Sequence, residues 1–362
     1  MITQYPDSIG QVTKFGALQT GFSPAFTSPF GDLIAQHLTP SIQMDFVYGV
    51  NTQIGATTVV GTGVADTNAS RLRLQTGTGT TGSAILQSRR PSKYRPGQGV
   101  IARFTAAFTV GAASSTQIIG AGNSNDGYFF GFNGTAFGIL HRNSGSDTWV
   151  AQTAWNGDKC DGTGASSLNW DKTKGMVCMI KYPYLGYGNI TFWVEDPLTT
   201  QMILCHTIRY NNSSASVQIS NPNLSFYAQA INAGNNTNLI LYCGSVGFFL
   251  CGERAFVANP QWATDNSKTP AATTETCIIN VRNATTYNGV ANRSLIRLNS
   301  VSFTAASAAK TAAACFLRFR IGASIGGSPS YAARSGTTAD NGVTITSGNS
   351  VASFDTDRKS VV

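Results

Sequence analysis

The chain is poor in charged residues, which make up 12% of its 362 residues, about half of the usual share in globular proteins. Glutamate is the scarcest, with only Glu195, Glu253 and Glu275. Exposed helix faces favour residues such as Glu and Lys, so this scarcity argues against a helical protein. Gly (38 residues), Ser, Thr and Asn fill the polar positions, and Gly and Asn supply the positive φ angles of tight turns. The composition therefore favours short strands joined by many turns.

The sequence also lacks the motifs of common enzymes, with no G-x-S-x-G, H-E-x-x-H or phosphate-binding loop. Its three histidines, His37, His141 and His206, lie beside apolar residues without a catalytic motif around them. A glycosidase needs two carboxylates about 5–9.5 Å apart, whereas Glu195 and Asp196 are neighbours whose side chains diverge at a strand end. We predict that the protein is not an enzyme and has no catalytic residue and no cofactor.

The seven cysteines show no C-x-x-C spacing, and several lie inside apolar runs, where cysteine behaves as a small buried hydrophobe. The beginning, MITQYPDSIG, lacks the charged-then-apolar pattern of a signal peptide. No apolar run approaches the roughly 20 residues of a membrane helix. We therefore expect no structural disulfide, no membrane insertion, and folding in a reducing cytoplasm.

Strand signals follow one another along the middle of the chain. Val100–Val110 (VIARFTAAFTV) is predicted to be a strand, and Tyr128–Phe132 and Thr135–His141 flank the hairpin signal Asn133-Gly134. Met176–Tyr182 begins a further run of strands. Turns recur every 8–12 residues or so, which is typical of a sandwich. The predicted fold is all-β: a jelly-roll or concanavalin A-like β-sandwich with an extended N-terminal arm and a second, smaller β region.

Composition shifts divide the chain into four parts. Residues 1–45 form the predicted arm, 46–255 the main sandwich, 256–275 a linker or long loop, and 276–362 a C-terminal β domain.

The arm carries aromatic side chains without a strand or helix pattern that would pack them against one another. They are Phe15, Phe22, Phe26 and Phe30. Because four exposed rings are unfavourable in water, we expect the arm to lie in an apolar groove, of its own domain or of a neighbouring subunit, and to drive assembly or anchoring.

Two oxygen-rich loops are weak candidates for a calcium site. They contain Asp126, and Asp158 with Asp161. Calcium prefers six to eight oxygen ligands, but neither spacing matches a known calcium loop. Asx turns explain the same residues, so we predict no metal.

A basic cluster lies in SRRPSKYRPGQG and comprises Arg89, Arg90, Lys93 and Arg95. The net charge of +8 reflects the shortage of acids rather than an excess of bases. No aromatic stacking platform accompanies the cluster, so we do not expect nucleic acid as a partner. A solvated face or a contact patch between subunits is favoured.

Three tryptophans in polar, loop-like stretches are candidate glycan contacts: Trp149, Trp155 and Trp170. A sugar ring stacks on an aromatic ring, while amides bind its hydroxyl groups. The alternative is that these side chains plug the ends of the sandwich, because Trp is usually mostly buried.

Several long and unusual stretches of the sequence resemble those of a known protein family. They include YRPGQGVIARFTAAFTVG, DGYFFGFNGTAFGILHR, YLGYGNITFWVEDP and VRNATTYNGVANRSLIRLNSVSF. They resemble a family of uncharacterised virion proteins of large double-stranded DNA phages and giant algal viruses, regarded as fibre, decoration or other surface components. The resemblance spans about residues 40–335. The meander YGNITFWVEDPLTTQMILCHTI is also similar to concanavalin A-like and laminin-G-like sandwiches.

Two functional hypotheses follow. The first is a structural component of a virus particle, a capsid, decoration, appendage or fibre subunit made in the host cytoplasm and located in the virion. It would act by self-assembly, with a homo-oligomer (a trimer favoured) and other virion proteins as partners. The alternative is a lectin-like module that binds a carbohydrate or receptor, such as a host surface glycan, through the loops at one end of the sandwich.

Overall fold

The structure, a computed structural model, describes residues 37–252 without a break. It also describes residues 10–12, 18–20, 29–30, 279–283, 286–287, 290–291, 300–303, 332–333 and 343–347. The chain divides into two compact units, Met1–Ala255 and Phe256–Val362. The predicted linker, 256–275, and most of the predicted arm lie outside the described residues.

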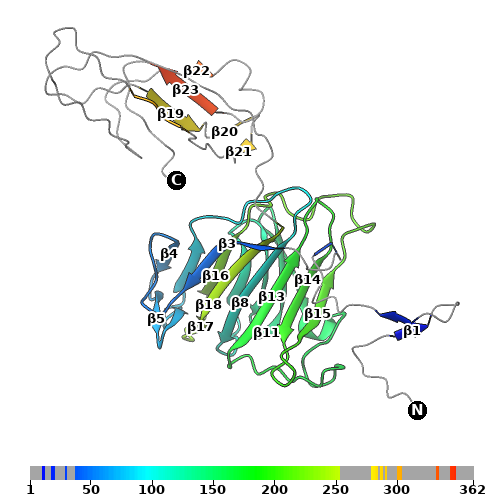
Figure 1. Ribbon diagram of the computed structural model, residues 1–362. Helices are drawn as coiled ribbons and strands as arrows, with labels where there is room; N and C mark the ends of the chain where they lie inside the picture. The colour runs from blue at the N-terminus through cyan, green and yellow to red at the C-terminus, as the bar shows by residue number, and fades with distance from the viewer. Residues whose placement is uncertain are drawn as a thin grey trace, which may run out of the picture. The chain divides into compact units, whose positions relative to one another are not determined.

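Two antiparallel sheets build the first unit (Figure 1). The seven-stranded sheet contains β4 (Gly55–Val60), β7 (Ser83–Ser88), β9 (Ser115–Gly122), β10 (Gly127–Asn133), β11 (Ala136–Asn143), β12 (Ser146–Ala151) and β16 (Ser225–Asn232). The nine-stranded sheet contains β3 (Leu38–Asp45), β5 (Val64–Asn68), β6 (Arg71–Gln75), β8 (Val100–Phe108), β13 (Met176–Tyr182), β14 (Ile190–Glu195), β15 (Met202–Ile208), β17 (Ile240–Cys243) and β18 (Ser245–Cys251). Between residues 37 and 252 the one helical segment is the 3-10 turn η2 (Gln152–Ala154). The predicted all-β sandwich is confirmed.

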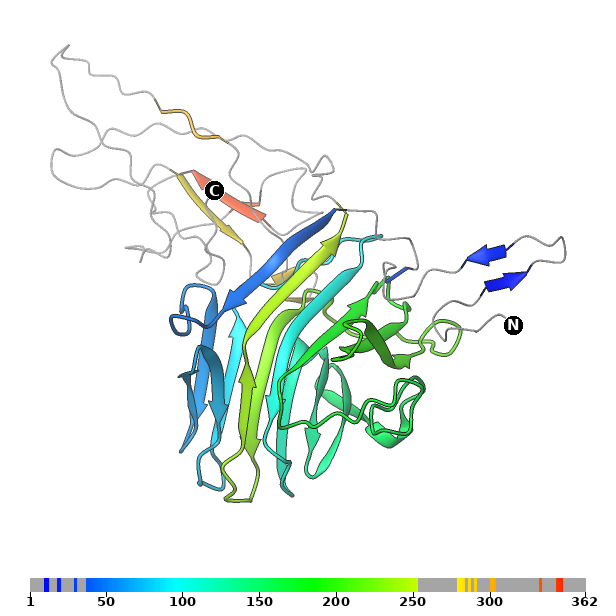
Figure 2. The same cartoon turned by 60° about the horizontal axis from the view of Figure 1, so that its bottom comes forward.

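The strand order places β4 and β12 at the two edges of the seven-stranded sheet, which runs β12-β11-β10-β9-β16-β7-β4. The other sheet runs β15-β14-β13-β8-β17-β6-β5, and β18 continues it beside β8. Because β17 and β18 pair with the same side of β8, this sheet forks: β17 continues to β6, whereas β18 continues to β3. Figure 2 shows β3 and β18 side by side on one arm of the fork.

Residues 38–45, which the sequence pattern places in the arm, form β3 in the sheet. The sequence pattern did not predict this strand, because it contains Pro40. Proline cannot donate a ladder hydrogen bond and is confined to edge strands and bulges. Both conditions hold here: β3 is an edge strand, and Pro40 pairs with Phe249 at an irregularity in the register.

The core fills the space between the sheets because alternate side chains of each strand face inward. On β8, Ala102, Phe104 and Ala106 point into the core, and on β13 Cys178 and Ile180 do the same. The hairpin that the Asn-Gly signal predicts joins β10 to β11, but its two-residue connection is Gly134-Thr135, one residue later than predicted, because Asn133 pairs with Ala136; Gly134 takes φ = 59°.

Five cysteines fall in the described part of the chain, and all are free and buried: Cys160, Cys178, Cys205, Cys243 and Cys251. The Sγ atoms of Cys160 and Cys205 lie 3.7 Å apart. Burial raises the pKa of the Cys243 thiol to about 12, so this side chain stays neutral and packs as a small apolar group. Cys277 and Cys315 lie outside the described residues.

Two histidines are buried in their neutral form. The Nδ1 atom of His206 accepts a hydrogen bond from the Asn156 amide at 3.2 Å, and burial lowers the pKa of His206. Burial also lowers the pKa of His141, whose Nε2–H donates to the Gln218 carbonyl. Protonation of His206 would remove the acceptor that Asn156 needs.

We therefore expect the protein to lose stability as the pH falls from about 7 to about 5, through the ordinary histidine pKa of about 6.5. The folded pKa values are lowered, so the unfolded chain binds more protons in this range and acid favours unfolding. Urea unfolding at several pH values should show a midpoint that falls with acid. The slope should be shallower in a variant combining His141→Gln and His206→Gln; an equal slope would contradict the assignment.

In the second unit the described residues include short strands, which agrees with the smaller β region that the sequence predicts. Its described strands are β19 (Ile279–Asn283), β20 (Thr286–Tyr287), β21 (Val290–Ala291), β22 (Ala332–Ala333) and β23 (Val343–Ser347). They form the sheets β19-β23-β22 and β20-β21. In the first unit, β1 (Gly10–Val12) and β2 (Leu18–Thr20) form a separate hairpin. No helix in the described residues is long and apolar enough to span a membrane.

Candidate functional site

A pocket opens where the loop formed by residues 46–54 crosses from β3 in one sheet to β4 in the other. The loop begins on Phe46, which is fully buried in the core. Directly after this anchor the chain turns outward: the Gly49 amide donates to the Phe46 carbonyl at 3.4 Å, and Gly49 has φ = 114°. A side chain is strained at that φ, so glycine suits the turn.

Hydrogen bonds hold the second half of the same loop. Asn51 closes an Asx turn by accepting the Gln53 amide on Oδ1 at 2.9 Å, and its carbonyl accepts the amides of Ile54 and Gly55. From the β7 end, Arg89 donates through Nε to the Thr52 carbonyl at 2.7 Å. The loop is thus fixed at both ends and across its middle, which pre-forms the pocket beneath it.

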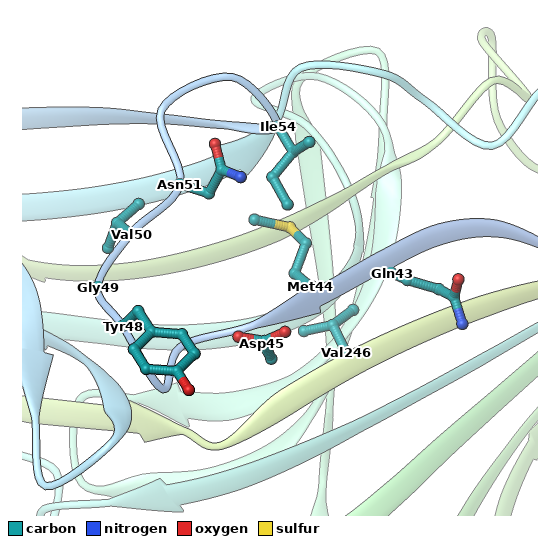
Figure 3. Close-up of a pocket in the computed structure, with 9 residues that line it drawn as sticks. All are labelled: Gln43, Met44, Asp45, Tyr48, Gly49, Val50, Asn51, Ile54 and Val246. Carbon is teal, nitrogen blue, oxygen red and sulfur yellow. The ribbon is translucent and has the colours of Figure 1, made fainter.

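The pocket has a volume of about 680 Å³, within the range of about 300–1,000 Å³ of small-molecule sites. Its lining combines apolar and polar side chains: Gln43, Met44, Asp45, Tyr48, Val50, Asn51, Ile54 and Val246, with Gly49. Figure 3 shows Tyr48 and Asp45 along one side in that view, Asn51 and Ile54 along the other, and Met44 between them. Met44 and Val246 are buried and belong to the core, so the floor of the pocket is rigid.

Tyr48 is the most unusual residue of the pocket, because its side chain is 99% exposed. Tyrosine normally covers much of its ring, since apolar burial is favourable by about 25 cal/mol per Å². Val47 and Ile54 in the same loop are also exposed, at 54% and 37%. An apolar surface presented on a fixed loop marks a binding surface rather than a fold requirement.

Polar groups line the same pocket as this ring. The Asp45 Oδ1 atom accepts one long hydrogen bond of 3.4 Å from the Val47 amide, which leaves most of the carboxylate's acceptor capacity. Gln43 is exposed and makes no side-chain hydrogen bond within the described residues, and the Asn51 Nδ2 group is not used in its turn. The pocket lining thus includes a carboxylate, two amides and one aromatic ring.

The pocket lining carries a single acidic group. Asp45 is the one carboxylate among the lining residues, and none of them is a histidine, cysteine or lysine. Glycoside hydrolysis needs two carboxylates, and nucleophilic catalysis needs a nucleophile beside a base.

The structure corrects the prediction that Trp155 and Trp170 contact a glycan, because each residue is only 3% exposed. Both rings pack edge-on against Phe130 in the core, so they close the sandwich, as the alternative explanation proposed. Trp149 is half-buried on the outer face of β12, against the cluster of Phe129 and its neighbours. None of the three lines the pocket.

The three aspartates considered as weak calcium ligands accept hydrogen bonds from backbone amides. Asp126 is buried and accepts the amides of Ser144 and Ser220 together with the Ser220 hydroxyl. Asp158 accepts the amides of Cys160 and Ser166. Asp161 accepts the amide and the hydroxyl of Thr163, so Asp158 and Asp161 each close an Asx turn with the residue two positions on. Among the described residues no group of three His, Cys, Asp or Glu side chains could hold a metal ion.

The predicted basic cluster lies in the connection from β7 to β8, and Arg89 of the cluster donates a hydrogen bond to the site loop. Arg90 is exposed, whereas Lys93 and Arg95 are half-buried. Of the aromatic arm, Phe30 is 38% exposed, and Phe15, Phe22 and Phe26 lie outside the described residues.

The sequence did not single out Tyr48, Asp45, Gln43 or Asn51. The only local signal was the string DFVYGVN, in which Tyr and Val stand beside the turn formers Gly49 and Asn51. The exposure of that tyrosine depends on the path of the loop between the two sheets.

No protein-family model matches this chain, and no curated protein matches it. The resemblance to virion proteins therefore finds no support in the family comparison. Among solved structures, the botulinum neurotoxin serotype C1 binding domain aligns at 10% identity and a TM-score of 0.33, over 54% of this chain and 44% of that chain. The binding domain of botulinum neurotoxin DC in complex with SialylT aligns at 12% identity and a TM-score of 0.31, over 54% and 42%.

The same DC domain in complex with rat synaptotagmin II aligns at 12% identity and a TM-score of 0.32, over 54% of this chain and 43% of that chain. This chain thus spans less than half the length of the neurotoxin chains that it matches. At these TM-scores, the likeness carries no argument about function.

Proposed function

We propose that this protein is a non-enzymatic binding module that recognises a carbohydrate, or a carbohydrate-bearing receptor, at the pocket under the loop of residues 46–54. The observation that carries the proposal is Tyr48, fully exposed on a loop whose two halves are both fixed. A sugar ring has C–H groups on its faces and hydroxyl groups at its edge. Tyr48 suits the faces, and Asp45 with the amides of Gln43 and Asn51 suits the hydroxyls.

The expected energy of this contact is modest. Covering one face of a tyrosine ring removes on the order of 60–100 Å² of apolar surface, worth about 1.5–2.5 kcal/mol. A difference of 1.4 kcal/mol corresponds to about tenfold in affinity. Tyr48→Ala should therefore weaken binding about tenfold or more while leaving the fold unchanged, because the side chain makes no contact with the core.

The first test is a screen of the full chain against immobilised glycans, repeated with two variants. Tyr48→Ala should lose the signal on every glycan that the unchanged protein binds. Tyr187→Ala is the matched control, since Tyr187 is also exposed (43%) but belongs to the connection between β13 and β14 and does not line the pocket. An equal loss in both variants, or no binding by the unchanged protein, would overturn the proposal.

A structural subunit of a virus particle is the second candidate function. The observation in its favour is β4, an edge strand of the seven-stranded sheet with no charged residue and with Val59 and Val60 more than half exposed. Such an edge suits assembly. The two functions are compatible, because a surface subunit can also carry a binding site.

A further inference from the structure

The edge strands of the sandwich are not equally protected against pairing with another chain. An edge strand presents unpaired backbone N–H and C=O groups, and proteins protect such edges with charges, prolines, bulges or a covering segment. The five edge strands in residues 37–252 are β3, β4, β5, β12 and β15.

Four of these edges carry such protection. β3 contains Pro40 and ends in Asp45, and its register is irregular. β5 contains Asp66, which pairs with Arg73, and β12 contains Asp147, which pairs with Arg142. The edge of β15 is covered by the segment 156–158, whose Gly157 and Asp158 amides donate to the carbonyls of β15.

β4 has none of these devices. Its sequence, GATTVV, has no charge and no proline, and it pairs with β7 in a regular register without a bulge. Between Ala56 and Val59 the described residues make no backbone hydrogen bond beyond the ladder with β7. The alternate backbone groups of this segment therefore point away from the sheet without a partner.

The side chains of β4 are also uncovered. Val59 lies opposite Ala84, which belongs to the core, so Val59 points to the inner side of its sheet and is nevertheless 51% exposed. Val60 points to the outer side and is 54% exposed. Apolar β-branched side chains are thus exposed on both faces of one uncharged strand.

We propose that β4 pairs antiparallel with β4 of a second copy of this chain, which joins the two seven-stranded sheets across a two-fold axis. Charge permits this occupant: each copy carries a net charge of +8, but β4 has no charged residue, so two β4 strands meet without like charges opposite one another. A two-fold contact needs a surface that complements itself, and an antiparallel strand pair fulfils this condition. In one register Thr58 lies opposite Val60 of the second copy, a pair of β-branched residues on the outer side of the joined sheet, suited to cross-strand packing.

The experiment measures the mass of the full chain by sedimentation over a range of concentrations, for the unchanged protein, Val60→Lys and Val110→Lys. Val60→Lys places a charge on the strand edge, and the exposed side chain leaves the folded monomer intact. We expect the unchanged protein and Val110→Lys to sediment at twice the chain mass of 38.2 kDa, and Val60→Lys at the chain mass. Val110 is 69% exposed and lies outside β4, so it matches the substitution without touching the edge.

Hydrogen exchange then identifies the surface. The amides of residues 55–60 should exchange more slowly as the concentration of the unchanged protein rises, and not in Val60→Lys. An oligomer of any size that Val60→Lys leaves intact would overturn pairing through β4, while self-assembly itself would stand. A monomer at all concentrations would overturn both. Neither result affects glycan binding at Tyr48, which is measured separately.

Discussion

Phe130→Ala is expected to lower the free energy of unfolding by about 3–5 kcal/mol. Phe130 is fully buried at the centre of an aromatic cluster. Its ring centroid lies 5.3 Å from that of Phe192, 5.9 Å from Trp170 and 6.1 Å from Trp155, in edge-to-face arrangements. Truncation removes these contacts and leaves a cavity that the surrounding rings, held on different strands and loops, cannot fill.

Urea unfolding followed by circular dichroism measures this loss. Phe249→Ala is the matched control, because Phe249 lies on the outer face of β18, half-buried beside Arg103. Its removal should cost less than about 2 kcal/mol. Equal losses in the two variants would contradict the placement of Phe130 at the centre of the core.

Gly131→Ala is expected to destabilise the sandwich by about 3 kcal/mol, at the upper end of overpacking costs. A methyl group at this position of β10 would lie 1.9 Å from the carbonyl oxygen of Gln117 on β9. Because the obstacle is the backbone of the neighbouring strand, no side-chain rotation can relieve the clash. β10 would have to shift against β9, which disturbs the ladder on both of its sides.

The comparison for this substitution is Gly175→Ala, which meets no atom within 4 Å. We expect that variant to change stability by less than about 0.5 kcal/mol. If thermal unfolding showed the two alanine variants to be equally stable, the close approach of β9 to β10 would be refuted.

The strands that the sequence located best are those with long, mainly apolar runs. Met176–Tyr182 is β13 to the residue, and Val100–Val110 contains the whole of β8. Such runs stand out in the sequence because both faces of β8 and β13 carry buried side chains. β3 was not predicted because Pro40 is incompatible with a central strand of a sheet. Only the sheet order shows that β3 lies at an edge, where proline is tolerated.

The site was harder to predict than the fold. Trp155 and Trp170 stand in polar, loop-like stretches, and only the way the segment between β12 and β13 packs against the sandwich buries them. Tyr48 stands in an unremarkable turn, and only the crossing from β3 to β4 exposes it. Local sequence reports the period of a strand, whereas burial within a loop is decided by segments distant in the chain.

Binding and assembly would reinforce each other if both occur, because a dimer presents two pockets to a surface that carries many glycans. Linked sites bind such a surface more tightly than one site does without any new contact. The loop that carries Tyr48 runs directly into β4, so both features belong to one short stretch of the chain, residues 46–60.

The most direct test of the central claim is a calorimetric titration of a glycan selected in the screen into three proteins: unchanged, Tyr48→Ala and Tyr48→Trp. Stacking on an exposed ring predicts that Tyr48→Ala binds about tenfold more weakly or not measurably. Tyr48→Trp, which keeps an aromatic face, should bind within a few-fold of the unchanged protein. If Tyr48→Ala bound with unchanged affinity, the glycan would lie elsewhere on the protein and the pocket under the loop of residues 46–54 would not be its site.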